Sequence, residues 1–284
     1  MSYNKIVIEK KLREFLIEDC NFSDISALCI PENAEVTAKI IVKSRGYISG
    51  IEELKILFDL LKVTTNFLKE DGDEVKKGDI VVELRGKARD ILLGERVGLN
   101  LITHMSSITT TTRKFNKIIS NSGNKIKIAC TRKTLPGLRI FEKKAVSLGG
   151  GDPHRFSLDD MILLKDTHLK FYKGDVAKML KVVKNQSSFS KKIEIEVEKP
   201  KDALIAAKIG ADIIMLDNMS PDQVEDVIKS LKENNLRDKV LIEISGGINE
   251  DNIVDYLIAS PDIVSSSELT QFPPQKVDLS LRFD

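Results

Sequence analysis

Ile193-Glu-Ile-Glu-Val-Glu-Lys-Pro-Lys-Asp-Ala-Leu-Ile-Ala-Ala-Lys-Ile-Gly-Ala-Asp-Ile-Ile-Met-Leu216 contains two short apolar segments with a helical pattern between them. Residues 193–197 and 213–216 have the length and composition of strands, and residues 200–208 have the spacing of a helix. A strand, a helix and another strand in this order are typical of a parallel sheet, because parallel neighbours need a crossover connection. This stretch therefore predicts a fold of βα units.

The same alternation continues on both sides of this stretch. The predicted strands are 126–130, 161–164, 193–197, 213–216, 240–244 and 263–265, and the helical patterns between them are 136–147, 174–185, 200–208, 220–233 and 249–258. A complete (β/α)₈ barrel has more strands than these. The sequence therefore predicts either an incomplete barrel or a barrel with two strands that the pattern does not reveal.

The chain before residue 88 has a different rhythm, without regular βα alternation. We expect helices at 7–19 and 50–62, strands at 36–43 and 80–84, and a polar turn at 69–79. One long helical stretch, continuous or broken, follows to about residue 121. Residues 277–283 alternate apolar and polar side chains and predict one more strand, which could pair with the N-terminal segment.

Composition excludes several classes of function. The 284 residues include 44 Lys and Arg and 43 Asp and Glu, so the net charge is +1, lower than bulk binding to nucleic acid favours. The first thirteen residues lack the apolar core of a signal peptide. The longest uncharged run, between Arg96 and Arg113, is too short and polar to span a membrane. The widely spaced Cys20, Cys29 and Cys130 indicate reduced thiols, so we expect a cytoplasmic protein.

Polar or reactive residues follow every predicted barrel strand. They are Thr131-Arg132-Lys133-Thr134, Lys165-Asp166, Glu196 to Glu198, Asp217-Asn218, Ser245-Gly246-Gly247 and Ser265-Ser266-Ser267. In βα barrels the active site lies at the C-terminal ends of the strands. The sequence therefore predicts that these residues surround one site.

The arginines and a glycine run indicate that this site binds an anion. Five of the eleven arginines lie between residues 96 and 155, and arginine matches carboxylates and phosphates with two parallel hydrogen bonds. Residues 149–155, Gly-Gly-Gly-Asp-Pro-His-Arg, allow close approach of the backbone to a ligand. We interpret His154 as a site residue, His104 as structural and Arg113 as a surface residue, and His168 remains open between a site and a structural role.

Two further features favour phosphate and ribose chemistry. Ser245-Gly246-Gly247, before a helix expected to begin near Asn249, is compatible with phosphate binding or with simple helix capping. Glu196 and Asp217 end neighbouring strands, where they could hold Mg²⁺ through water or stabilise a developing oxocarbenium ion. No set of histidines and cysteines has the spacing of zinc ligands.

These motifs together resemble the quinolinate phosphoribosyltransferase family. The resemblance rests on 131–139 (Thr-Arg-Lys-Thr-Leu-Pro-Gly-Leu-Arg), 142–146, 149–155, 163–168, 194–198, 215–218, 243–247, 278–281 and Glu95-Arg96 with Leu99-Asn100. It implies an α/β protein with an N-terminal α/β sandwich domain, residues 1–105 joined by the C-terminal strand 275–284. The same resemblance implies an incomplete, about six-stranded α/β barrel at 106–274.

The resemblance also implies the reaction and the role of each site residue. Quinolinate and phosphoribosyl pyrophosphate would give nicotinate mononucleotide, pyrophosphate and CO₂, with Mg²⁺, in NAD biosynthesis. Quinolinate would be bound by Arg132, His154, Arg155 and Lys165, the pyrophosphate side by Lys133, the ribose and Mg²⁺ by Glu196 and Asp217, and the 5′-phosphate by Ser245, Gly246 and Gly247, near Ser267. The catalytic residues would be Lys133, Lys165, Glu196 and Asp217. Arg96 would complete the site of a neighbouring subunit, which implies at least a homodimer.

Several positions depart from the commonest pattern of the family and leave other functions open. Asn21-Phe-Ser-Asp24, Pro153 and Thr167 replace more usual residues, and Ser267 stands in place of a glycine, where its side chain could crowd or bind the phosphate. The alternatives are the molybdenum-locus paralogue of the family, a phosphoribosyltransferase specific for nicotinate, and a non-catalytic binding protein. Lys165 argues against the first, the number of cations against the second, and the complete set of charged site residues against the third.

Overall fold

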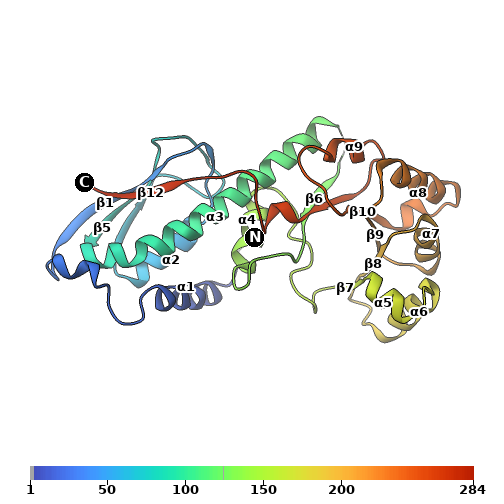
Figure 1. The fold of residues 1–284 in the computed structure, drawn as a ribbon, viewed down its shortest axis with the longest axis horizontal. Coiled ribbons are helices and arrows are strands. Elements are labelled where there is room, and N and C mark those ends of the chain that lie inside the picture. Colours follow the sequence, from blue (N-terminus) through green and yellow to red (C-terminus); the bar gives the residue numbers. More distant parts are fainter. Residues whose placement is uncertain (1–2, 124) are drawn as a thin grey trace. The chain divides into compact units, whose positions relative to one another are not determined.

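The computed structural model describes residues 3–123 and 125–284 and divides into two compact units (Figure 1). The first unit comprises the chain up to Arg113 together with Pro136–Gly150 and Pro273–Asp284. The second comprises Lys114–Leu135 and Gly151–Phe272. The long helix α3 (Ala88–Asn121) is continuous and contributes residues to both. No helix of the described part of the chain has the length and apolar character that crossing a bilayer requires.

An antiparallel sheet forms the centre of the first unit. Its strand order is β12 (Leu279–Phe283), β1 (Glu35–Val42), β5 (Ile80–Lys87) and β3 (Thr64–Phe67). Alternate residues of β1 are buried, so one face of the sheet forms the core with α1 (Lys5–Asp19), α2 (Ile51–Leu60) and α3. Because β12 pairs with β1, the last strand does return to the N-terminal segment.

The helical pattern at 136–147 forms α4 (Arg139–Leu148), which belongs to the first unit instead of covering the parallel sheet. Its buried ammonium group, Lys144 Nζ, lies 2.8 Å from Glu53 Oε1 of α2, and its Glu142 Oε1 lies 2.9 Å from His104 Nε2 of α3. Buried charged groups need an opposite charge or a hydrogen bond, and residues of α2 and α3 provide these contacts for α4. The domain limits at residues 105 and 275 stay a prediction.

A parallel six-stranded sheet forms the second unit. Its strand order is β6 (Lys127–Cys130), β11 (Ile263–Ser266), β10 (Leu241–Ser245), β9 (Ile213–Asp217), β8 (Ile193–Val197) and β7 (Ile162–Leu164). β6 and β11, the first and last of these strands along the chain, pair with each other, and within the described residues β6 and β7 remain the two open edges. The prediction of an incomplete barrel is therefore confirmed, and hidden seventh and eighth strands are excluded among these residues.

Helices follow the strands of this sheet, as the sequence pattern predicts. They are α5 (Asp166–Phe171), α6 (Val176–Gln186), α7 (Pro200–Ile209), α8 (Pro221–Glu233) and α9 (Ile253–Leu257). The pattern missed the short α5 and three short strands, β3, β2 (Gly46–Tyr47) and β4 (Glu74–Val75). β4 lies inside the predicted polar turn and pairs with β2. Single turns of 3₁₀ helix occur at Ser26–Cys29, Arg237–Lys239 and Ser267–Leu269. Elements of this length leave too few residues for a periodic signal.

The segment after the three glycines covers the open edge of β6. The Asp152 N–H donates to the carbonyl oxygen of Ile128 at 2.8 Å, and the Cys130 N–H donates to the carbonyl oxygen of Asp152 at 3.1 Å. These bonds satisfy backbone groups of an otherwise unpaired strand edge. The same bonds keep His154 and Arg155, which follow Asp152 by two and three residues, beside the carboxyl end of β6.

Candidate active site

The carboxyl ends of the parallel strands surround a cavity of about 710 Å³. The structure brings eleven of the twelve predicted site residues to it: Arg132, Lys133, His154, Arg155, Lys165, Glu196, Asp217, Ser245, Gly246, Gly247 and Ser267. Parallel strands all end at the same edge, so residues far apart in the chain meet there. The location agrees with the sequence analysis, whereas the role of each side chain stays a prediction.

Arg96 belongs to the other unit. It is exposed on α3 and lines a cavity of about 420 Å³ together with Asn100, His104 and residues of α1. His104 itself bonds to Glu142, which agrees with a structural role. His168 also has a structural contact, because its Nδ1 accepts a hydrogen bond from the Lys165 N–H at the start of α5.

Lys165 and the two predicted metal-binding carboxylates form a charged group at the ends of β7, β8 and β9. Lys165 Nζ donates to Glu196 Oε2, and Asp217 Oδ2 accepts a bond of 2.6 Å from Asn218 Nδ2. Partial burial raises the pKa of Asp217, and the nearby charge of Glu196 raises it further, while Lys165 opposes the shift. The repulsion between the two carboxylates indicates that a cation between or near them would be stabilised.

The glycine loop after β10 has a conformation that requires glycine. Gly246 and Gly247 have φ angles of 96° and 64°, and a Cβ at Gly246 would lie 2.7 Å from the backbone nitrogen of Asn218. The predicted helix beginning near Asn249 is wrong, since α9 begins at Ile253 and has five residues. The side-chain oxygen of Asn249 accepts from the N–H groups of Asp251 and Asn252, a turn that competes with helix formation. The loop therefore has backbone N–H groups to offer an anion but no helix N-terminus.

Ser266 and Ser267 show how two adjacent serines differ. The Ser266 hydroxyl donates to the carbonyl oxygen of Ile248 at 2.6 Å and is buried, so it holds the glycine loop to β11. Ser267 is partly exposed and lines the cavity. The side chain that replaces the usual glycine therefore faces the space in which a phosphate is predicted.

Two arginines lie close together on the β6 side of the cavity. Arg155 is 7% exposed, and its Nη1 donates to the carbonyl oxygen of Met161 at 3.2 Å. Burial lowers the pKa of Arg155, and the neighbouring charge of Arg132 lowers it further. Two like charges in a partly buried place are unfavourable by themselves, so this arrangement favours an anion between them.

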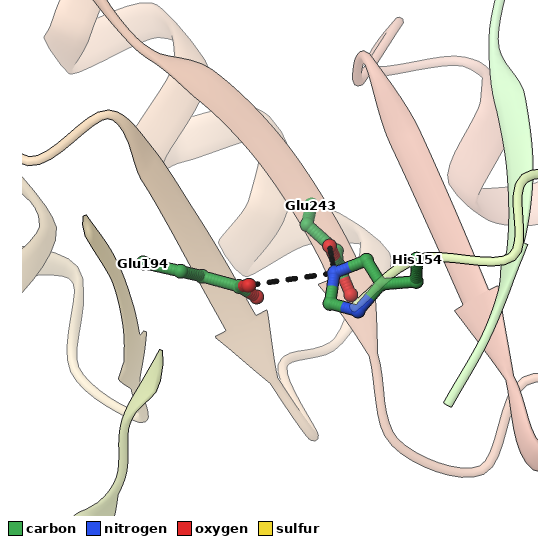
Figure 2. A group of neighbouring side chains, drawn as sticks. All are labelled: His154, Glu194 and Glu243. Carbon is green, nitrogen blue, oxygen red and sulfur yellow. Dashed lines mark hydrogen bonds and ion pairs between the residues drawn. The ribbon is translucent and has the colours of Figure 1, made fainter. Parts of the chain in front are cut away.

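His154 faces two carboxylates from the interior of the barrel (Figure 2). Its Nε2 lies 3.1 Å from Glu243 Oε2 and 3.4 Å from Glu194 Oε2. Burial alone would lower the pKa of His154, but the close contacts with the carboxylates of Glu194 and Glu243 and their negative charges outweigh it and raise the pKa to about 10. This surrounding favours the protonated form of the His154 ring.

Glu194 and Glu243 are the site residues that the sequence analysis did not single out. Each lies between two isoleucines of a strand, in Ile-Glu-Ile-Glu-Val and Leu-Ile-Glu-Ile-Ser. A strand of a helix-covered parallel sheet is buried on both faces, so a glutamate there must have a partner. A glutamate in a strand that is expected to be buried was therefore the sequence signal that could have identified these two residues.

Comparison with known proteins now adds to this geometry. Residues 24–106 match the family model described as Quinolinate phosphoribosyl transferase, N-terminal domain, and residues 108–282 match that of the C-terminal domain. The chain belongs to the quinolinate phosphoribosyl transferase family. The resemblance found in its motifs is thus confirmed, and so is the combination of an N-terminal sheet domain with an incomplete barrel.

Relatives within this family are similar over almost their whole length. A protein of Archaeoglobus fulgidus named "Probable nicotinate-nucleotide pyrophosphorylase [carboxylating]" is 42% identical over 92% of this chain and 98% of its own. A Dictyostelium discoideum protein named "Nicotinate-nucleotide pyrophosphorylase [carboxylating]" is 34% identical over 98% of this chain and 96% of its own. The solved structure of the nicotinate-nucleotide pyrophosphorylase from Francisella tularensis is 32% identical, with a TM-score of 0.89 over 100% of this chain and 98% of that one.

Proposed function

We propose that this chain is a quinolinate phosphoribosyltransferase that releases CO₂, a pentosyltransferase of NAD biosynthesis. Quinolinate and phosphoribosyl pyrophosphate give nicotinate mononucleotide, pyrophosphate and CO₂. The names of the family and of its relatives support this assignment. The observation that carries it is the cavity at the strand ends. Its lining includes the basic side chains Arg132, Lys133, His154, Arg155 and Lys165 and, among its carboxylates, Glu196 and Asp217.

The cationic side of the cavity suits a planar molecule with two adjacent carboxylates. In our proposal Arg132 and Arg155 bind these carboxylates, and His154 and Lys165 add further charge around the ring. Several cations at fixed positions offset the loss of water from a dianion, which one or two could not do. The same arrangement would hold the pyridine nitrogen toward the anomeric carbon of the ribose, so that attack needs little reorientation.

The acidic side suits the ribose, whose anomeric carbon becomes positive as pyrophosphate leaves. Glu196 and Asp217 would accept hydrogen bonds from the ribose hydroxyls and stabilise this charge, and Lys133 would bind the departing pyrophosphate. Ser245, Gly246 and Gly247 would hold the 5′-phosphate through backbone N–H groups. After the bond to nitrogen forms, the bond between the adjacent ring carbon and its carboxylate would break and release CO₂. The positive ring nitrogen would stabilise the electron pair left on that carbon, which then takes a proton from water.

Magnesium fits the acidic side of the cavity. Carboxylate oxygens are its preferred protein ligands, and the mutual repulsion of Glu196 and Asp217 is of the kind that a divalent cation relieves. These two residues would hold Mg²⁺ directly, through water or through the substrate. When bound, the ion supplies positive charge that stabilises the pyrophosphate as it leaves.

We infer further that the protein works as a homodimer or larger assembly. Arg96 is an exposed arginine whose own unit does not contain the cavity at the strand ends. In our proposal it reaches the quinolinate site of the neighbouring subunit. An exposed guanidinium is suited to such a contact.

Binding of the two pyridine carboxylates tests this function without turnover. We expect isothermal titration calorimetry to show quinolinate binding at least about 100-fold more tightly than nicotinate, because nicotinate leaves one set of charged hydrogen bonds unmade. Phthalate, which keeps both carboxylates but lacks the ring nitrogen, is the matched control and should bind more tightly than nicotinate. Equal affinity for quinolinate and nicotinate would favour the nicotinate-specific alternative.

A further inference from the structure

We propose that Glu194 and Glu243 are positioning residues that keep His154 as an imidazolium, and that this buried triad provides one of the cations that recognise the dicarboxylate. The inference rests on the proposed function for the identity of the substrate. It assigns a role to two interior glutamates that the reaction itself does not use. The argument comes from their burial, their unmet hydrogen bonds and the charges around them.

The three side chains meet inside the sheet from three separate segments (Figure 2). Glu194 comes from β8, Glu243 from β10 and His154 from the segment along the edge of β6. The side chains of both glutamates are 0% exposed, and that of His154 is 11% exposed. One ring nitrogen, Nε2, faces both carboxylates, which leaves Nδ1 as the remaining donor of the ring.

The carboxylates cannot be satisfied by neutral neighbours. Within the described residues, both oxygens of Glu194 and Oε1 of Glu243 are buried without a hydrogen-bond partner. A buried carboxylate is expensive unless a positive charge lies beside it. Burial accordingly raises the pKa of Glu194, the charge of Glu243 raises it further, and only His154 and Arg155 act in the opposite direction.

The positive charge beside these two carboxylates comes from His154, as the other groups around it show. From β7, β9 and β11 the side chains that line the cavity are the uncharged Leu163, Met215 and Ser265. The charge of Arg155 also acts on Glu194, and Arg132, Lys165, Glu196 and Asp217 lie at the strand ends around the same cavity. His154 and Arg155 line a second cavity as well, whose other charged residues are Lys125, Lys127, Asp152, Asp160, Lys192 and Asp262. With His154 neutral, Glu194, Glu243 and Arg155 would together carry a net negative charge under a site for a dianion. With His154 protonated they are balanced.

The backbone conformation of His154 is also consistent with a fixed position of its side chain. Its φ angle is 51°, in the left-handed region that residues other than glycine rarely adopt, and its N–H donates to Asp152 Oδ1 at 2.8 Å. Such a conformation persists only where surrounding contacts impose it. Here the contacts are Asp152 on one side and the two glutamates on the other.

Protonation of His154 can be measured directly, because the chain has three histidines. In full-length protein labelled with ¹³C at histidine Cε1, substitutions of His104, His154 and His168 assign the three signals. We expect the His154 signal of the wild type to stay in its protonated position up to about pH 9, well above the ordinary value of about 6.5. In Glu243→Gln and Glu194→Gln it should titrate below about pH 7, because burial then dominates. Glu225→Gln, on the exposed face of α8, is the matched control and should behave as the wild type.

Steady-state kinetics give the second readout. KM for quinolinate should be nearly independent of pH up to about 9 in the wild type. In Glu243→Gln it should be near the wild-type value at pH 6 and about tenfold higher at pH 8.5, with kcat changed far less, because loss of the imidazolium removes about 1.4 kcal/mol of binding. A glutamate that only fills space would give no such pH dependence when replaced by the isosteric glutamine.

Three results would overturn the proposal. One is a wild-type His154 that titrates near its ordinary value, which decides the question even if the glutamine variants fail to fold. Another is a KM for quinolinate that does not depend on pH in folded Glu243→Gln. The third is one equivalent of a transition metal in the purified wild type that is lost in Glu243→Gln, since the ligand atoms of the triad lie within 4.8 Å of one another and could hold an ion. The histidine titration needs no turnover, so failure of the proposed activity would be recognised separately.

Discussion

Arg155→Ala is expected to lower kcat/KM for quinolinate by at least about 100-fold, mainly through KM. Arg155 is nearly buried at the cavity, and its loss would leave one substrate carboxylate desolvated without its charged donor. Removing one member of a buried, hydrogen-bonded charge pair costs about 3 kcal/mol or more, which corresponds to this factor. Arg155→Lys should recover part of the loss, because it restores the charge but not the two parallel donors.

Arg237→Ala is the matched control for this substitution. Arg237 pairs with Asp262 at 2.9 Å, before β10 and β11 begin, and thus at the opposite end of the same sheet. Its removal should leave KM for quinolinate unchanged even if it reduces stability. An Arg155→Ala protein that binds quinolinate as well as the wild type would remove Arg155 from the substrate site.

Arg96→Ala and Lys165→Ala should each abolish most activity, and mixing the two proteins should restore some of it. If Arg96 serves the neighbouring subunit, a mixed dimer has one site with both defects and one intact site. After complete exchange of subunits at equal concentrations, about one quarter of the wild-type activity should return, because half of the dimers are mixed. The measurement is the rate of the mixture after exchange, compared with each variant alone.

A second mixture controls for nonspecific rescue. Lys133 and Lys165 line the same cavity of one chain, so a dimer of Lys133→Ala and Lys165→Ala has no intact site. This mixture should stay inactive. If subunit exchange is demonstrated by mass spectrometry and the Arg96→Ala and Lys165→Ala mixture also stays inactive, Arg96 does not complete a neighbouring site.

The sequence predicts the parallel sheet well, because its strands are short apolar runs separated by long helical patterns. The prediction for β8 matches Ile193–Val197, and the other five strands differ by one or two residues at their ends. The polar residues at the strand ends then meet for a geometric reason, since all parallel strands end at one edge. This is why the location of the cavity could be inferred from a list of residues that are far apart in the chain.

Periodicity fails where side-chain chemistry decides the structure. The pattern of α4 is helical, but only the pairing of its buried Lys144 and Glu142 shows which unit it joins. Asn249 ends the glycine loop in a side-chain turn and delays the helix by four residues relative to the expected start. Glu194 and Glu243 look like polar positions of exposed strands, and their meeting with His154 depends on tertiary structure. None of these features has a repeating signal.

The central claim is tested most directly by following the carboxylate that the reaction must release. The purified protein is incubated with phosphoribosyl pyrophosphate, Mg²⁺ and quinolinate labelled with ¹⁴C in the carboxyl group beside the ring nitrogen, and in parallel with unlabelled nicotinate. We predict one labelled CO₂ for each nicotinate mononucleotide formed from quinolinate, and no mononucleotide from nicotinate. Mononucleotide from nicotinate alone, or no product from either substrate, would contradict the proposed function.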